Sequence, residues 1–231
     1  MTIKLSRDSI RAGQVYRMLT EQQKITNIRP LTDEERATAL DAFLARAPEG
    51  PVWVFAYGSL IWNPAFHHAG RTTARIWGLH RSFCLQTPLG RGSPDNPGLV
   101  LALDLGGSCA GIAYRLPDDG IREELQYVWD REMALDSYRA VWVRARTDEG
   151  PINAVTFAIN HSSERYVSKL PEEQKVHMLA HASGHLGSSR EYLENTVDQL
   201  REAGIRDHYL FRLYEKVQAY TAGPLNQMRH R

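Results

Sequence analysis

Residues 52–62 read VWVFAYGSLIW, from Val52 to Trp62. The run begins as an apolar stretch rich in β-branched and aromatic side chains, which is typical of a buried strand. The strand pattern then breaks at Gly58-Ser59. A strand that ends in a small, flexible dipeptide can leave consecutive backbone N–H groups unpaired, and such a loop can hold an anion or a developing oxyanion. An ordinary strand-to-turn junction has the same pattern, so both interpretations stand at this point.

The composition limits the class of protein. The chain has 231 residues, 42% of them hydrophobic, which is enough for one substantial core. Its 28 basic and 27 acidic residues nearly balance, so nothing indicates a nucleic-acid or anionic-membrane partner. No apolar run approaches the roughly 18 residues of a membrane-spanning helix. The N-terminus does not resemble a secretory signal, and Cys84 and Cys109 both have apolar neighbours, so we expect buried thiols in a cytoplasmic protein.

Helical patterns are expected at both ends of the chain. Residues 1–48 are predicted to form an N-terminal helical extension, in which Thr32 is an N-cap followed by acidic first-turn residues. Helices are also expected at about 119–134 and after residue 171, where proline, acidic residues and a capping box mark helix starts. Residues 222–231 are predicted to form a loose tail.

Strand patterns dominate between residue 52 and about residue 160. Gly106-Gly107-Ser108 is predicted to be a hairpin turn that joins the strand patterns at 99–103 and 110–116. Strands in the middle with helices at both ends favour an α+β fold, and we expect a single domain over residues 49–221.

Glu132 has the strongest case for an acid–base role. It lies three residues after Trp129 and four after Val128, so it projects on the apolar side of the helix predicted at 119–134. A carboxylate on a core-facing stripe must be paired, or its pKa rises. A raised pKa near the working pH is what a general base needs. A salt bridge with a basic residue such as Arg131 is the alternative, and spacing alone does not separate the two.

Other candidate residues have weaker patterns. His177, His181 and His185 recur every four residues, which allows a metal site on one helix face, but Gly184 interrupts that helix and favours solvated or capping histidines. Ser59 does not fit the Gly-x-Ser-x-Gly pattern of a hydrolase nucleophile, so it is better assigned to a backbone cradle. No glycine-rich nucleotide-binding motif is present in the sequence.

Several blocks together resemble the signature of the ChaC family of γ-glutamylcyclotransferases. They are Phe55-Ala56-Tyr57-Gly58-Ser59-Leu60-Ile61-Trp62-Asn63-Pro64, Arg91-Gly92-Ser93-Pro94 with Pro97-Gly98, Gly111-Ile112-Ala113-Tyr114, Asp130-Arg131-Glu132, and Ser183-Gly184-His185 with Glu191-Tyr192-Leu193. The Tyr-Gly-Ser-Leu block followed by Arg-Glu on a later helix is more specific than either alone.

The resemblance implies a fold and a reaction. The fold is a small mixed β-barrel with helices packed around it, to which this chain would add N-terminal and C-terminal helices. In the reaction, the α-amine of a γ-glutamyl group attacks its own γ-carbonyl, closing 5-oxoproline and expelling the next amine. The implied substrate is glutathione, the other product is Cys-Gly, and no metal or organic cofactor is called for.

The resemblance also assigns roles to residues. It places the catalytic glutamate at Glu132 and the substrate-binding loop at Tyr57, Gly58, Ser59, Leu60, Ile61 and Trp62. Members of the family often carry an aromatic hydroxyl on the last barrel strand, where this chain has Phe157. A substrate-orienting hydroxyl is then missing, or it comes from Tyr114 or Tyr166.

Two alternatives remain from the sequence. The same chemistry can act on other γ-glutamyl amines or dipeptides, or the chain can be a non-catalytic regulator of cation transport. We expect a small-molecule substrate, no nucleic-acid or membrane partner, and a monomer, although the sequence does not determine the oligomeric state.

Overall fold

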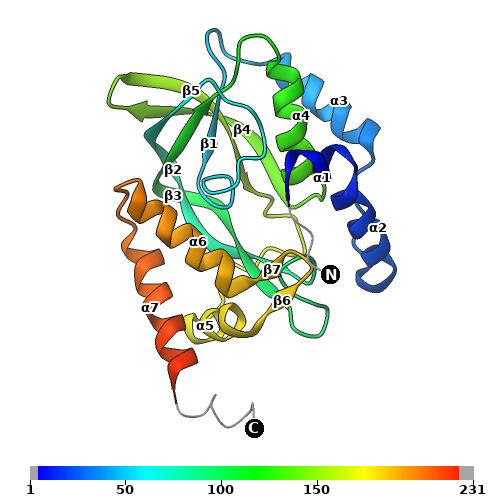
Figure 1. The fold of residues 1–231 in the computed structure, drawn as a ribbon, viewed down its shortest axis with the longest axis vertical. Coiled ribbons are helices and arrows are strands. Elements are labelled where there is room, and N and C mark those ends of the chain that lie inside the picture. The colour runs from blue at the N-terminus through cyan, green and yellow to red at the C-terminus, as the bar shows by residue number, and fades with distance from the viewer. Residues whose placement is uncertain (1–4, 224–231) are drawn as a thin grey trace.

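A closed, mixed β-barrel forms the centre of the molecule (Figure 1). The computed structural model describes residues 5–223. The barrel strands are β1 (Trp53–Ala56), β2 (Gly70–Thr87), β3 (Gly98–Arg115), β4 (Tyr138–Thr147) and β5 (Gly150–Ile159), in the order β1-β3-β2-β4-β5. β1 pairs antiparallel with β3 and parallel with β5, which closes the barrel. The predicted α+β class and mixed barrel are confirmed.

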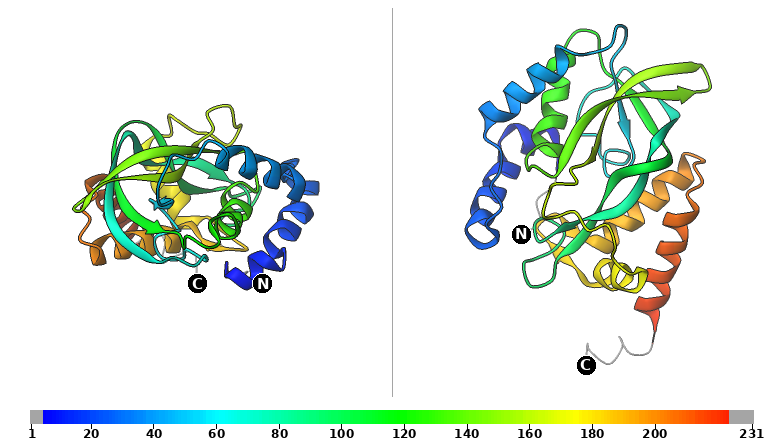
Figure 2. Two further views of the ribbon diagram at one scale, coloured as in Figure 1. Left: turned by 90° about the horizontal axis from the view of Figure 1, so that it is seen from above. Right: turned by 180° about the vertical axis from the view of Figure 1, so that it is seen from behind.

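Helices cover two sides of the barrel (Figures 1 and 2). One group contains α1 (Arg7–Arg11), α2 (Gln14–Thr26), α3 (Asp33–Leu44) and α4 (Ile121–Glu132). The other contains α5 (Glu172–His181), α6 (Ser189–Glu202) and α7 (His208–Ala222), with the short strands β6 (Ser183–Gly184) and β7 (Gly187–Ser188) pairing between α5 and α6. Thr32 caps α3, as predicted, by accepting the Glu35 N–H. Residues 224–231 of the predicted tail lie outside the described residues.

The prediction of a hairpin turn at Gly106-Gly107-Ser108 is wrong. These residues lie inside β3, which pairs antiparallel with β2 along nearly its whole length. Gly106 and Gly107 have φ angles of 93° and 66°, and Gly78 on β2 has a φ of 82°. The pairing register shifts at this point, so the glycines form an irregularity that lets both strands bend together. The turn between β2 and β3 lies instead in the Gly- and Pro-rich segment 88–97.

The core fills the barrel and extends under the helices. Val54, Phe55 and Ala56 of β1 are fully buried, and Trp129 of α4 packs edge-on against Phe157 of β5 at 5.8 Å between ring centroids. Both cysteines are buried and unpaired. Among residues 5–223, no helix is long and apolar enough to cross a membrane.

Candidate active site

The segment after β1 folds into a tight turn. The Ile61 N–H donates to the Gly58 carbonyl at 2.9 Å, and the Asn63 N–H donates to the Ser59 carbonyl at 2.9 Å. The turn therefore already uses the Ile61 amide, so this amide is not available to a developing oxyanion. Gly58, Ser59 and Leu60 carry the remaining candidate amides.

A buried arginine fixes the start of this turn. Arg81 on β2 is 5% exposed, and its Nε donates to the Tyr57 carbonyl at 2.5 Å while its Nη2 donates to the Ala110 carbonyl at 2.7 Å. Arg81 also pairs with Asp207, whose side chain caps α7. The barrel, the turn and the last helix are thus joined at one residue.

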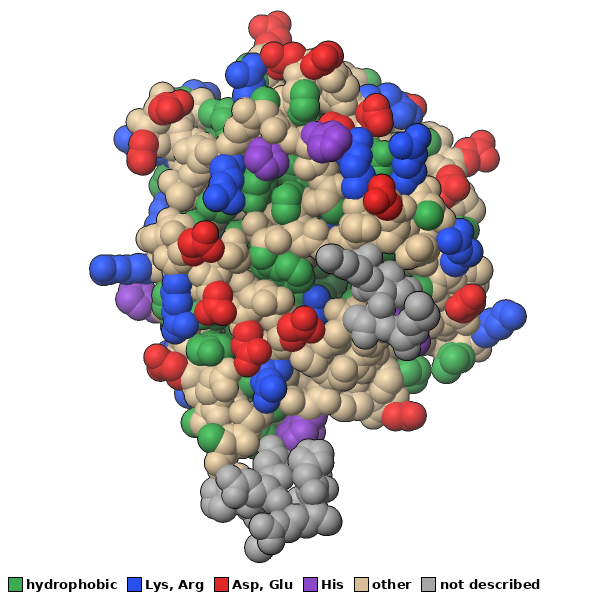
Figure 3. Space-filling view, viewed as in Figure 1, with side chains coloured by type: hydrophobic (Ala, Val, Ile, Leu, Met, Phe, Trp, Pro, Cys, Tyr) green, Lys and Arg blue, Asp and Glu red, His purple; other side chains and the backbone are tan. Residues whose placement is uncertain are grey.

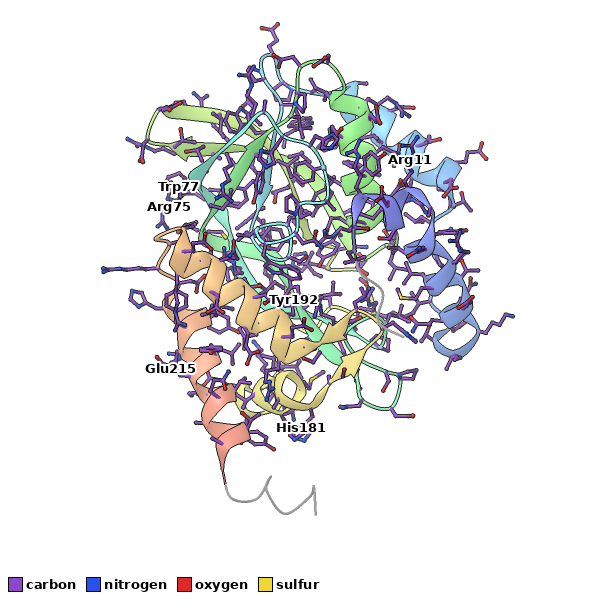
Figure 4. The ribbon with its side chains drawn as sticks, in the orientation of Figure 1. Arg11, Arg75, Trp77, His181, Tyr192 and Glu215 are labelled. Atoms are coloured by element: carbon purple, nitrogen blue, oxygen red, sulfur yellow. The ribbon has the colours of Figure 1, made fainter. Side chains whose placement is uncertain are left out.

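Two adjoining cavities lie beside the turn, with volumes of about 160 Å³ and about 20 Å³. Four residues line both of them: Ser59, Glu132, Tyr138 and Tyr192. Tyr57, Gly58 and Leu60 line the smaller cavity as well. Tyr192 lies near the middle of the molecule, where α6 faces the barrel (Figure 4), and the surface on this side is hollowed over an apolar floor (Figure 3). The structure therefore brings Glu132 and most of the predicted loop to the same space.

Glu132 is the last residue of α4, and its side chain is 13% exposed. Arg131 Nε lies 3.2 Å from Glu132 Oε1, so the salt bridge considered from the sequence is present. Within residues 5–223, however, no donor makes an aligned hydrogen bond to the Glu132 carboxylate. Burial raises the pKa of Glu132 above its ordinary value, although the Arg131 charge opposes that rise. The ion pair does not fill the space beside the carboxylate, because both residues line the larger cavity.

Two tyrosine hydroxyls near Glu132 are bonded to the backbone. The Tyr57 hydroxyl donates to the Phe157 carbonyl at 2.8 Å, and the Tyr138 hydroxyl donates to the Leu101 carbonyl at 3.0 Å. These bonds hold both rings at the smaller cavity, which Phe157 and Leu101 also line.

The third phenol, Tyr192, packs directly on the turn. A Cβ placed on Gly58 would lie only 2.7 Å from Tyr192 Oη, so a glycine is needed for this approach. Burial raises the pKa of Tyr192 and of the two other phenols, and the negative charge of Glu132 adds to each rise. All three hydroxyls therefore stay protonated at neutral pH. Tyr57 and Tyr138 donate their protons to backbone carbonyls, which leaves the Tyr192 hydroxyl as the candidate donor to a ligand among the three.

The larger cavity has an excess of positive charge. Arg91, Arg131 and Arg165 line it, whereas Glu132 is the acidic residue among its described lining residues. The Arg91 guanidinium stacks over the Tyr192 ring at 5.1 Å and donates to a backbone carbonyl of β7. Three cations against one carboxylate favour a ligand that carries carboxylate groups.

Two residues of the predicted loop, Ile61 and Trp62, line neither cavity. Ile61 is 3% exposed and faces a different surface pocket, and the Trp62 Nε1 donates to Thr196 Oγ1 at 3.4 Å. Of the two tyrosines considered as orienting hydroxyls, Tyr114 donates to the Ile61 carbonyl and Tyr166 donates to an aspartate of β3. Neither tyrosine lines the cavities around Glu132.

Sequence reasoning did not assign Tyr138, Tyr192, Arg91 or Arg165 to the site. Tyr192 and Arg91 did lie in blocks that resemble the family, which was the available signal. Tyr138 and Arg165 had no such signal, because only the barrel closure brings them next to Glu132. Within residues 5–223, no group of three or more histidine, cysteine, aspartate or glutamate side chains is arranged to hold a metal ion.

Several known proteins are similar to this chain in sequence and fold. A family profile described as "ChaC-like protein" matches residues 52–220. A glutathione-specific γ-glutamylcyclotransferase of Escherichia coli K12 is 39% identical over 82% of this chain and 83% of its own length. Glutathione-specific γ-glutamylcyclotransferase 1 of Mus musculus is 28% identical over 66% and 71%.

A crystal structure of a γ-glutamyl cyclotransferase specific to glutathione from yeast superposes with a TM-score of 0.66, at 24% identity, and covers 74% of this chain and 97% of that chain. This likeness shows that the barrel and its helices form the same fold. With the profile covering most of the sequence, the chain belongs to the ChaC-like protein family.

Proposed function

We propose that this protein is a glutathione-specific γ-glutamylcyclotransferase that converts glutathione into 5-oxoproline and Cys-Gly. The observation that carries the proposal is that Glu132 and the Gly58-Ser59 turn line the same cavity. The sequence similarity to enzymes with this name supports the choice of substrate. The excess of arginines in the larger cavity also suits glutathione, which carries two carboxylates.

In this mechanism Glu132 acts as the general base. It takes a proton from the α-ammonium group of the γ-glutamyl residue, and the free amine then attacks the γ-carbonyl carbon. The new C–N bond closes a five-membered ring and turns the carbonyl oxygen into an oxyanion. When the oxyanion collapses, the bond to the cysteinyl nitrogen breaks, and this nitrogen takes the first proton from Glu132. The ring nitrogen still carries a second proton, which Glu132 passes to the released amine, so that 5-oxoproline forms as a neutral lactam and Cys-Gly leaves as an ammonium. The raised pKa of Glu132 suits these transfers, because it lies closer to the working pH.

The turn would stabilise the oxyanion. The amides of Gly58, Ser59 and Leu60 are fixed in place by the bonds within the turn and by Arg81, so they need little reorganisation during the reaction. The Tyr192 hydroxyl, which packs against Gly58, is a further donor at the same place. Because both reacting groups belong to one molecule, holding glutathione in a folded pose supplies much of the remaining acceleration.

The test measures 5-oxoproline and Cys-Gly formed from glutathione by the wild type and by Glu132→Gln. Loss of the base should lower kcat by about 100-fold or more. Glu123→Gln is the matched control, because Glu123 lies on the same helix with its side chain 68% exposed. It should stay within about two-fold of the wild type, as expected for a surface substitution. Absence of product from the wild type, or full activity in Glu132→Gln, would refute the proposal.

The proposal also includes a reducing, cytoplasmic setting and a monomer. Two buried, unpaired thiols at Cys84 and Cys109 suit a reducing compartment. Comparing kcat/KM for glutathione with kcat/KM for other γ-glutamyl amines and dipeptides separates the proposed specificity from a broader cyclotransferase.

A further inference from the structure

One wall of the larger cavity comes from outside the region that matches the family profile. The segment before residue 52 contributes four apolar lining residues: Leu5, Val15, Met18 and Leu19. The last three lie at positions i, i+3 and i+4 of α2, so they share one helix face. Each of these three is 5–7% exposed, although α2 is otherwise a surface helix.

This wall is held in place at several points. The Arg7 guanidinium, at the start of α1, donates to both carboxylate oxygens of Glu124 on α4, at 2.5 Å and 2.9 Å. The Leu5 carbonyl accepts from Asn63 Nδ2 at 2.7 Å, just after the turn. After α2, the Leu31 N–H donates to the carbonyl of residue 134 at 2.9 Å. The segments before and after α2 are therefore both bonded to the elements that carry Glu132 and the turn.

The lining of the larger cavity combines polar and apolar side chains. Ser59, Arg131 and Glu132 are among the polar ones, and the α2 face supplies three of the apolar ones. Under the proposed function, the γ-glutamyl group must sit beside Glu132, because its amine gives its proton to that carboxylate. The rest of the substrate then lies in the larger cavity, which the α2 face also lines.

We infer that the α2 face formed by Val15, Met18 and Leu19 is the subsite for the side chain of the expelled amino acid. The subsite selects a compact, uncharged side chain, such as the cysteinyl group of glutathione. It disfavours a charged one, because these three apolar side chains offer a charge neither a hydrogen bond nor a counter-charge. The inference rests on the proposed function and adds to it a specificity element that belongs to the N-terminal extension.

The test compares kcat/KM for glutathione with kcat/KM for γ-glutamyl-aspartyl-glycine, in which a carboxylate replaces the thiol. Met18→Ala and Leu19→Ala should each lower the preference for glutathione by roughly ten-fold, the scale of a changed apolar contact in a pocket. Ile25→Ala is the matched control on the same helix, because Ile25 is 73% exposed, and it should keep the wild-type ratio.

A second pair of variants keeps the test decisive if the alanine variants fail to fold. Met18→Leu and Leu19→Met change the shape of the face at nearly constant volume and should shift the ratio in the same direction by about two-fold or more. If the wild type is active and the folded variants of Met18 and Leu19 keep its ratio, the subsite is refuted while the proposed function stands. If the wild type releases 5-oxoproline from neither peptide, the proposed function fails first.

Discussion

Arg7→Ala should destabilise the protein far more than an ordinary surface charge removal. The Arg7 side chain is 23% exposed and the Glu124 side chain only 8%. Arg7 also lies over the Tyr127 ring, with its Cζ 3.7 Å from the ring centroid. Without Arg7, the buried Glu124 carboxylate keeps the His67 amide, at 2.8 Å, as its remaining backbone donor.

The magnitude follows from this partial burial. Removing one partner of a fully buried pair costs about 3–5 kcal/mol, whereas an exposed pair is worth about 0–1 kcal/mol. Arg7 lies between these limits, and its contact with the Tyr127 ring adds about 0.5–1 kcal/mol. We therefore expect a loss of about 2–3 kcal/mol in the free energy of unfolding, or roughly 5–10 °C in Tm for a chain of this size.

The loss should depend on pH in a defined direction. Burial acts to raise the pKa of Glu124, but the hydrogen bonds from Arg7 and from the His67 amide bring it below its ordinary value. A carboxyl whose pKa is lowered on folding contributes stability above its unfolded pKa, and this stability is lost as the pH falls through the folded pKa. The difference between the wild type and Arg7→Ala should therefore be largest near neutral pH and shrink in acid.

Urea unfolding at a series of pH values measures this difference. Arg29→Ala is the matched control, because Arg29 makes the same two-bond contact with Glu35, at 2.9 Å and 2.8 Å, but with side chains 56% and 42% exposed. We expect Arg29→Ala to cost no more than about 1 kcal/mol. Equal losses in the two variants, or an Arg7→Ala loss that does not shrink in acid, would refute the reasoning.

Three further predictions concern the site and the core. Gly58→Ala should lower kcat/KM by roughly ten-fold or more, because the added methyl group would lie 2.7 Å from Tyr192 Oη and overpacking of this kind costs about 1–3 kcal/mol. Unchanged activity in steady-state kinetics would contradict this prediction. The value of kcat/KM should rise with pH through a pKa above the ordinary glutamate value, because Glu132 must be ionised to act as a base and burial raises its pKa. A kcat/KM that does not change between pH 4 and 7 would exclude Glu132 as the general base. Burial raises the pKa of Cys84 to about 12, so a thiol reagent at neutral pH should label it quickly only after unfolding, and rapid labelling of the native protein would contradict its burial.

The first barrel strand and the inward-facing position of Glu132 on α4 could be predicted because their signals are local. The apolar run from Val52 breaks at Gly58, two residues after β1 ends at Ala56, and the three- and four-residue spacings from Trp129 and Val128 to Glu132 placed its carboxylate on the inner side of α4. The same reasoning did not anticipate that Glu124 is buried. A position in the first turn of a helix is compatible with exposure to water. Glu124 is buried because Arg7, 117 residues away in sequence, and the His67 amide both donate to its carboxylate.

The errors arose where long-range pairing decides the outcome. Two adjacent glycines between apolar stretches indicate a hairpin, and nothing near Gly106 reveals that Gly78 on β2 allows a matching irregularity. In the same way, Tyr138 and Tyr192 reach Glu132 from a barrel strand and a distant helix. No periodicity within either element shows that their side chains meet.

The length of the β2–β3 hairpin has a mechanical consequence. Each strand has 18 residues, or about 60 Å of extended chain, and the ladder, which is interrupted by two register shifts, joins the barrel to the region beneath the C-terminal helices. The segment at its tip carries Leu89, Gly90 and Arg91 into the larger cavity. Bending the hairpin anywhere except at the two register shifts would break several ladder bonds at once. The paired segments on either side of each shift are therefore expected to move as rigid units, and any flexing of the hairpin should be concentrated at the shifts.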